Sequence, residues 1–159
     1  MSDQIYAVLI TLSDDTLLLP NSAVAEVLPL SVLQTASGSA DWLLGYCDWS
    51  DKRIPVINFE VLNGAAAGES GKRARIVIVH SLNAHLQTGA LGILTQGYPH
   101  LVTLSREALV PQVLRESDRP DLVLSRVAIA NHETAIPDLE AIEADIARHD
   151  FKRAGSATA

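Results

Sequence analysis

The sequence has one cysteine, few aromatic residues and no run of basic residues long enough to follow a nucleic acid. A single cysteine among 159 residues cannot form a disulfide within the chain. Aromatic residues are 4% of a chain that is 48% hydrophobic, so the core must be mainly aliphatic. The formal net charge is −7, and basic residues are scattered apart from Lys72, Arg73 and Arg75. Because a phosphate-binding surface needs a basic stripe, this distribution argues against a nucleic-acid partner.

Signals for secretion or membrane insertion are also missing. The first ten residues lack the basic region and the long apolar segment of a signal peptide, which favours a cytoplasmic protein. Residues 76–105 contain no Asp, Glu, Lys or Arg, but glycines, Pro99 and polar amides interrupt the segment. A membrane-spanning helix needs ~20 predominantly apolar residues in a row. We therefore expect paired, buried strands here and no direct insertion into a membrane.

Motifs of the common enzyme classes are absent as well. The sequence contains no Gly-x-Ser-x-Gly elbow, no His-Glu-x-x-His and no dinucleotide-binding fingerprint. Segment 68–73 resembles a phosphate-binding loop, but that loop needs glycine where Ala66 stands and Ser or Thr where Arg73 stands. Scattered histidines and one cysteine do not make a zinc site. We predict no catalytic residue, metal or cofactor, with a nucleophilic Cys47 as an open alternative to a small buried residue.

Short apolar runs bounded by turn residues predict a mainly β protein. The runs at 5–12 and 17–19 flank Ser-Asp-Asp-Thr, which is a hairpin signal. Pro55 lacks a backbone N–H and is expected on an edge strand or at a bulge. Further strands are expected at 30–35, 42–49, 53–57, 75–81, 122–130 and 134–137.

Two helices and two irregular segments complete the expected organisation. Asn21 can cap a short helix near residue 24, because Val24 and Val27 have helical spacing and Pro29 ends the pattern. A C-terminal helix is predicted after Asp138, with an apolar face made of Leu139, Ile142 and Ile146. The glycine-rich stretch 63–73 is typical of a flexible connection between two halves, and 150–159 of a disordered tail.

The most specific motif is the stretch 45–58. Residues 45–51 read GYCDWSD and residues 55–58 read PVIN. The CheW-like adaptor family of bacterial chemosensory systems has a glycine, two apolar residues, Asn-Leu-Arg-Gly and then Pro-Val-hydrophobic-Asp at this spacing. The order of the remaining elements, from residue 5 to residue 146, is also similar to that family. The chain thus resembles a single CheW-like domain over nearly its whole length.

This resemblance implies a fold and a function. The fold would be two intertwined, five-stranded SH3-like β-barrel lobes with a short helix near residue 24 and a C-terminal helix. The protein would be a non-catalytic scaffold with two partners, the regulatory domain of a CheA-type histidine kinase and the cytoplasmic tip of a methyl-accepting chemoreceptor. A tryptophan in the turn is similar to ChpC-type members, which implies type IV pili and twitching motility.

The resemblance also implies a partner-binding surface. Glu26 matches an acidic residue used in partner contact, and Gly45 and Pro55 match framework positions around the groove between the lobes. The expected partner-binding residues are Val24, Glu26, Val27, Gly45, Trp49, Arg53 and Pro55.

Residues 49–51 of the motif depart from the family pattern in ways that bear on partner contact. The family's arginine and glycine are Ser50 and Asp51 here, which removes a receptor contact but allows the turn, because Asp tolerates a left-handed backbone. Trp49 replaces a leucine and is either a partly exposed interface anchor or a buried side chain that fills a barrel.

A different class of function stays open beside the scaffold. A small β-barrel of this kind could bind a metabolite or a nucleotide in its groove. That alternative predicts a stoichiometric ligand that raises stability as its concentration rises.

Overall fold

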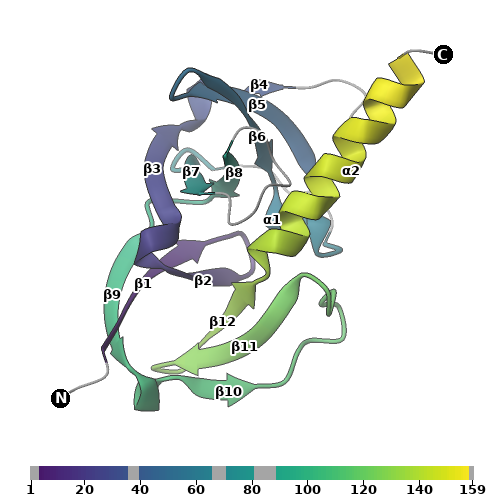
Figure 1. Ribbon diagram of the computed structural model, residues 1–159. Helices are drawn as coiled ribbons and strands as arrows, with labels where there is room; N and C mark the ends of the chain where they lie inside the picture. The colour runs from purple at the N-terminus through teal and green to yellow at the C-terminus, as the bar shows by residue number, and fades with distance from the viewer. Residues whose placement is uncertain (1–3, 36–39, 66–70, 81–88, 158–159) are drawn as a thin grey trace.

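The computed structural model describes residues 4–35, 40–65, 71–80 and 89–157, whose strands form two six-stranded sheets (Figure 1). Sheet A has the order β10-β11-β12-β2-β1-β9 and sheet B the order β3-β7-β8-β6-β5-β4. Sheet A consists of β1 (Gln4–Thr11), β2 (Thr16–Pro20), β9 (His100–Ser105), β10 (Val110–Gln112), β11 (Val123–Ile129) and β12 (His132–Pro137). Sheet B consists of β3 (Val24–Pro29), β4 (Gln34–Thr35), β5 (Leu43–Trp49), β6 (Lys52–Ile57), β7 (Arg75–His80) and β8 (Ala90–Thr95). Sheet A takes strands from both ends of the chain, so the two lobes are intertwined, as expected.

Each lobe has its own apolar core, and a third core joins the two. Buried side chains of sheet A alone, such as Ala7, Leu18 and Val127, form one cluster. Buried side chains of sheet B alone, such as Ile54 and Ile76, form another. The largest cluster combines residues of both sheets with residues of the two α-helices. A strand has two faces, and here one face fills its own barrel while the other packs on the second lobe.

The two sheets repeat one topology. A parallel pair lies inside each sheet, β6 with β8 through Val56 and Gly92, and β12 with β2 through Ala135 and Leu17. On one side of that pair follow β7 and β3 in sheet B, and β1 and β9 in sheet A. On the other side follow β5 and β4, and β11 and β10. The 3-10 turns η2 (Leu30–Val32) and η3 (Arg106–Ala108) join the outer strands in the same way.

Both hairpins that flank the parallel pairs lead into a capped helix. Asn58 Oδ1 accepts a hydrogen bond from the backbone N–H three residues on, at the start of α1 (Phe59–Leu62). Asp138 Oδ1 does the same at the start of α2 (Leu139–Ala157). A side-chain acceptor at this position satisfies an N–H that the first helical turn leaves unpaired. The predicted cap at Asp138 is confirmed.

Helix α2 packs on the core between the lobes. Leu139, Ile142 and Ile146 are buried there, so the predicted apolar face of the C-terminal helix is confirmed. The helix extends to Ala157, through most of the segment 150–159 that composition suggested as a disordered tail (Figure 1). No proline interrupts this segment, so a capped and well-anchored helix can continue through it. Nowhere in the described ranges is a helix both long and apolar enough to span a membrane.

The helix expected near residue 24 is reduced to one 3-10 turn. This turn, η1, spans Asn21–Ala23, and the side chain of Asn21 makes no capping hydrogen bond. The following residues form β3, in which Val24 pairs with Val79 and Val27 with Val77 of β7. Pairing between β-branched side chains favours a strand and outweighs the weak helical spacing.

Pro55 lies on an interior strand and outside the register shift of the β5–β6 pair, which corrects the prediction of an edge strand or a bulge. Strand β6 stands between β5 and β8. Pro55 is opposite Tyr46 of β5, but the pairing of β6 with β8 starts only at Val56. The strand therefore tolerates a proline just before the second ladder begins.

The glycine-rich segment 63–73 joins α1 to β7. Strands β6 and β7, which precede and follow this part of the chain, both belong to sheet B. The segment therefore connects two parts of one lobe rather than the two lobes. Residues 66–70 lie outside the described part of the chain.

Candidate functional site

The described part of the chain contains neither a metal site nor a reactive thiol. No group of three His, Cys, Asp or Glu side chains there is placed to hold a metal ion. Cys47 is buried in the core of sheet B, and its pKa is raised first by that burial and second by the charge of Asp48. A thiol that stays protonated away from solvent is a poor nucleophile. The structure therefore favours the interpretation of Cys47 as a core residue.

The main candidate site is built on a hydrogen bond between Glu26 and Trp49. The indole Nε1–H of Trp49 donates to Glu26 Oε2 at 2.7 Å. Glu26 lies exposed on β3, at one edge of sheet B, and Trp49 ends β5, which lies next to the other edge. The bond therefore spans the seam across which sheet B curls into a barrel. A hydrogen bond to an ionised carboxylate is roughly twice as strong as one between neutral groups.

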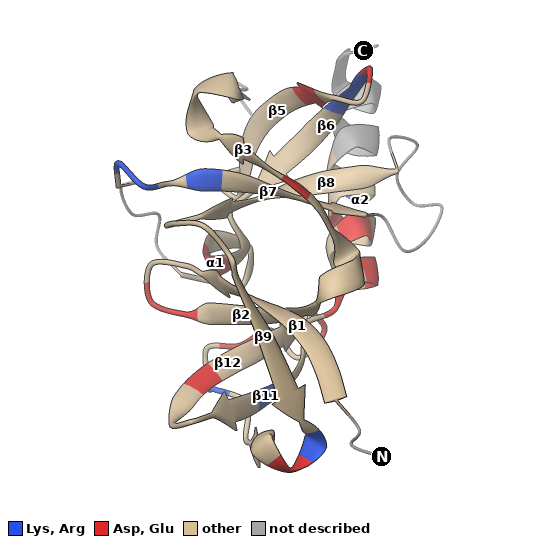
Figure 2. Ribbon diagram, turned by 90° about the vertical axis from the view of Figure 1, so that its left-hand side faces the viewer, with Lys and Arg blue, Asp and Glu red and all other residues tan. Residues whose placement is uncertain are grey.

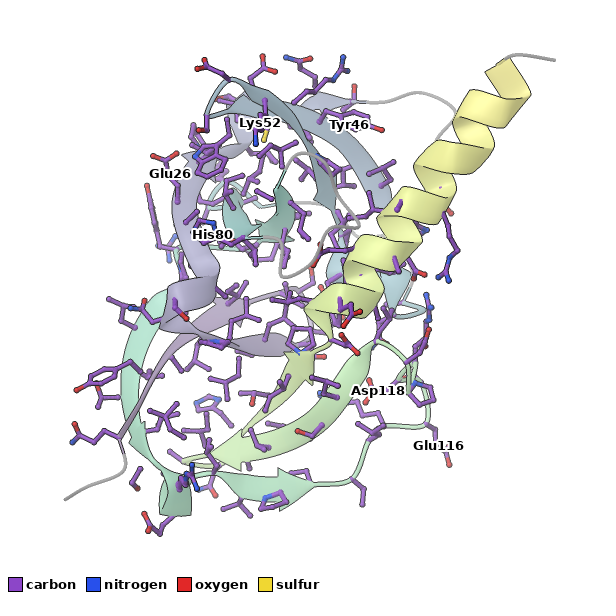
Figure 3. The ribbon with its side chains drawn as sticks, in the orientation of Figure 1. Glu26, Tyr46, Lys52, His80, Glu116 and Asp118 are labelled. Atoms are coloured by element: carbon purple, nitrogen blue, oxygen red, sulfur yellow. The ribbon has the colours of Figure 1, made fainter. Side chains whose placement is uncertain are left out.

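His80 belongs to the same site, although the sequence did not single it out. This residue ends β7, and its ring centroid is 6.4 Å from that of Trp49 at an interplanar angle of 68°. Figure 3 shows Glu26 and His80 on the same side of the sheet B lobe. We call Glu26, Trp49 and His80 the Trp49 cluster. Glu26 and His80 lie on the paired strands β3 and β7, and the curvature of the sheet brings Trp49 of β5 to them.

Trp49 is neither fully exposed nor fully buried. The side chain is partly buried and packs against the core of sheet B, while its N–H is held by Glu26. A tryptophan fixed in this way loses little freedom when a partner covers its remaining surface. Trp49 therefore has features of both alternatives, the interface anchor and the side chain that fills a barrel. Its ring closes the barrel of sheet B, and part of the ring faces solvent.

Two more of the expected partner-binding residues line the lobe junction. Val24 and Val27 on β3 are partly buried and pack against the core between the lobes. Glu26 stands between them in sequence and is exposed. Strand β3 thus offers partly covered apolar side chains and a carboxylate.

Arg53 contacts the ring of Tyr46. Its guanidinium is 4.8 Å from the centroid of the Tyr46 ring. Figure 3 places Tyr46 on the opposite side of the lobe from Glu26. Arg53 and Trp49 also line one hollow of about 630 Å³, together with the turn between them, so the expected surface continues from Trp49 to Arg53.

Gly45 and Pro55 are buried, so they shape the lobe from within. Gly45 has φ +153°, and a Cβ added there would lie 2.0 Å from the backbone oxygen of Gln34. Only glycine allows β4 to approach β5 this closely. Both residues act on the candidate surface through the backbone that they hold.

The turn beside Trp49 has the form that its sequence was expected to permit. Trp49 pairs with Lys52, and the two residues between them, Ser50 and Asp51, have φ of 51° and 63°. Two consecutive left-handed residues match the twist of a tight hairpin. The turn is thus kept without the family's arginine and glycine.

A buried ionic cluster was not recognised in the sequence. Arg126 has a side chain that is 1% exposed and donates to both carboxylate oxygens of Asp118, at 2.6 and 2.7 Å. It also donates to Asp15 Oδ2 at 2.8 Å and to Glu133 Oε1 at 3.3 Å. The hydrogen bonds from Arg126 are the main cause that lowers the pKa of Asp118 to about 2, and the pKa of Arg126 is raised in turn. In the sequence, the only signal of this ionic cluster is the lone arginine inside the apolar run 122–130.

Comparison with known proteins gives one family and a matching fold. The family model for the CheW-like domain matches residues 7–146. The chain is similar in structure to the scaffolding protein TtCheW from Thermoanaerobacter tengcongensis, with a TM-score of 0.70 and 18% sequence identity. The match covers 87% of this chain and 90% of that chain. At this identity the likeness establishes the fold, two SH3-like lobes. No curated protein matches the sequence.

Proposed function

Because this chain belongs to the CheW-like domain family, we propose that it is a non-catalytic signalling scaffold in a chemosensory system. Its partners are the cytoplasmic tip of a methyl-accepting chemoreceptor and the regulatory domain of a CheA-type histidine kinase, and it acts in the cytoplasm. The observation that carries the proposal is the family match over residues 7–146. The scaffold couples the two partners by binding both, without a chemical step of its own.

The Trp49 cluster supports a docking role. Partly covered tryptophans surrounded by polar groups are enriched at the energetic centres of interfaces. Here Glu26 fixes the indole before any partner arrives, since Trp49 Nε1 and Glu26 Oε2 are 2.7 Å apart. Glu26 therefore has two roles in the proposal, as a charge that a partner meets and as the residue that positions Trp49.

The first test is calorimetric titration of the chain with the kinase regulatory domain and, separately, with a receptor hairpin tip from the same cell. Binding to both supports the coupling role. Binding to the kinase alone assigns the missing receptor contact to the turn, where Ser50 and Asp51 stand in place of the family's arginine and glycine. Binding to neither partner contradicts the scaffold proposal.

Two substitutions locate the docking surface. Trp49→Ala removes the anchor and should weaken the affinity for the partner that covers it by tenfold or more, about 1.4 kcal/mol. Glu26→Gln keeps an acceptor for the indole but removes the charge, and should produce a smaller loss that depends on salt. Arg106→Gln, on η3 of the other lobe, is the matched control that changes an exposed charge elsewhere.

The pathway is proposed from one feature only. Trp49 beside a two-residue turn is similar to ChpC-type members, so we propose that the scaffold serves type IV pilus motility. Deletion of the gene should then impair twitching motility and leave swimming unchanged. Loss of swimming alone would instead assign the scaffold to flagellar chemotaxis.

A further inference from the structure

A second site lies where the two lobes meet, away from the Trp49 cluster. A hollow of about 520 Å³ is lined by residues of both sheets, Thr11, Arg73, Arg75, Gln96, Tyr98 and His100. Thr11 ends β1 and His100 begins β9 in sheet A, whereas Arg75 begins β7 and Gln96 follows β8 in sheet B. Sites for small molecules commonly measure ~300–1,000 Å³ and occur where two structural units meet. We call this feature the basic hollow.

The charge of the basic hollow is opposite to that of the chain. The formal net charge of the protein is −7, but the lining includes two arginines and a histidine, with no Asp or Glu. Lys72 is the neighbour of Arg73 in sequence. Figure 2 shows Lys and Arg residues together at and before the start of β7, apart from the acidic residues of the described chain. A local concentration of positive charge in a concave surface attracts small anions.

The arginines of the basic hollow have no carboxylate partner among the described residues. By contrast, Arg115, Arg119, Arg126 and Arg148 each form an ion pair with a carboxylate. Arg75 is instead placed over the ring of Tyr98, 4.9 Å from its centroid, and its Nη1 donates to the backbone oxygen of Ala74 at 2.8 Å. A guanidinium has five N–H donors, so most donors of Arg75 stay available to a ligand.

The backbone around the basic hollow is held in place before any ligand binds. Gln96 N–H donates to the backbone oxygen of Thr11 at 2.8 Å, which ties sheet B to sheet A. The side-chain Oε1 of Gln96 accepts from Gly71 N–H at 3.2 Å, which ties down the approach to Arg73. Because these segments are already ordered, a ligand does not lose affinity to the cost of ordering them.

We propose that the basic hollow binds a small organic molecule that carries a phosphate group. The phosphate oxygens accept hydrogen bonds from Arg73 and Arg75, because a planar guanidinium matches an oxyanion in shape and charge. His100 adds an imidazole, and the Tyr98 ring, which is 61% exposed, offers an apolar edge for the organic part. The hollow is larger than an inorganic phosphate requires, so the organic part contributes to affinity. This site is independent of the proposed scaffold role, because it uses none of the residues of the Trp49 cluster.

The test is calorimetric titration of the full chain with AMP, with adenosine and with inorganic phosphate, at one ionic strength. We expect AMP to bind in a saturable way with one site per chain, inorganic phosphate to compete more weakly, and adenosine not to bind. Arg75→Gln should weaken AMP binding by about tenfold or more, since it removes charged hydrogen bonds. Arg73→Gln, a change at an exposed residue that leaves the fold intact, should weaken it as well.

Arg106→Gln is the control, because it removes the same charge from an exposed position outside the hollow. Thermal unfolding of each variant without ligand checks that the fold is retained. Adenosine that binds as tightly as AMP would overturn the proposal, as would an equal effect of Arg106→Gln and Arg73→Gln. Phosphate that binds as tightly as AMP would overturn the claim that the organic part contributes, and absence of binding by both would overturn the site. None of these titrations contains a kinase or a receptor, so their failure and that of the scaffold proposal are distinguishable.

Discussion

The hairpin β5–β6 of sheet B and the hairpin β11–β12 of sheet A follow the same path. Both end in two residues with positive φ, Ser50 and Asp51 in one and Ala130 and Asn131 in the other. Both show one register shift early in the first strand, between Leu43 and Gly45 and between Val123 and Ser125. The shared frame allows residues to be compared by counting back from the two turns.

Three of the side-chain differences on this common frame distinguish the two lobes. Trp49, which precedes the turn of sheet B, corresponds to Ile129, and Tyr46 corresponds to Arg126. Tyr46 is covered by the exposed Arg53, whereas Arg126 is sealed among carboxylates inside the protein. Gly45 corresponds to Ser125, so the close approach of β4 is special to sheet B.

The difference separates a lobe with a buried ionic cluster from the lobe that we propose for partner recognition. In sheet A the hairpin is fixed from within by an ionic cluster, and Ile129 is buried. In sheet B the corresponding tryptophan stays partly exposed, bonded to Glu26 across the seam of the barrel. The repeated frame thus keeps its backbone while one copy holds an ionic cluster and the other presents the proposed docking surface.

The largest expected effect comes from removing Arg126. Arg126→Ala leaves Asp118 and Asp15 buried without their main partner, with side chains that are 1% and 7% exposed. Breaking a buried ion pair on one side destabilises a protein by about 3–5 kcal/mol. Urea denaturation at neutral pH measures the loss. The matched change Arg115→Gln touches an exposed arginine of the same cluster and should cost less than about 1 kcal/mol.

Equal losses of stability in Arg126→Ala and Arg115→Gln would contradict the view that the buried Arg126, and not the exposed Arg115, holds the cluster together. Loss of stability without loss of partner binding in Arg126→Ala would sharpen the comparison, because it would show that sheet A supports the fold only.

Gly45→Ala is expected to have the next largest effect. The added Cβ would meet the Gln34 backbone at 2.0 Å, and alanine rarely adopts φ +153°. Strained backbone positions cost about 1–3 kcal/mol, and the clash adds to this. Ser125→Ala at the corresponding place in sheet A should change stability little, because Ser125 has no positive φ. Thermal unfolding of the two variants compares the lobes, and similar shifts would argue against a special approach of β4.

Stability should also fall in acid because of the ionic cluster. The pKa of Asp118 is about 2 in the folded protein, below the ordinary value of ~3.9 for an unfolded chain. Its contribution is therefore complete above about pH 5 and is lost as the pH falls toward 2, a change of about 2 kcal/mol. Asp118→Asn should reduce this pH dependence in urea denaturation between pH 7 and pH 2. An unchanged pH profile in the variant would mean that Asp118 is not responsible.

Local signals in the sequence predicted much of the frame. The apolar runs and turn residues predicted most strands, and the cap at Asp138 with its apolar face predicted α2. The prediction of a helix near residue 24 was wrong, because Val24 and Val27 pair with β7. This pairing is a long-range contact that helical spacing cannot reveal. The position of Pro55 was wrong for the same reason, since strand order is a property of the whole sheet.

The candidate site was predicted less completely than the frame. Glu26 and Trp49 were both named, but their hydrogen bond joins residues 23 positions apart across a barrel seam. His80 was not named as a site residue, because a histidine at the end of an apolar strand carries no local sign of its neighbours. The Arg126 cluster joins Asp15 to a residue 111 positions later. Pairs this distant in sequence become visible only when the sheets are placed.

The smallest expected effect tests whether the two turns are energetically equivalent. Ser50 and Ala130 occupy the first turn position with φ of 51° and 48°, a region in which asparagine is several-fold enriched. Ser50→Asn and Ala130→Asn should therefore each stabilise the protein by about 0.5 kcal/mol, measured by urea denaturation. Equal gains would mean that the two hairpins differ only in their side chains. A gain at Ala130 alone would mean that the turn beside Trp49 is restrained by the site that it borders.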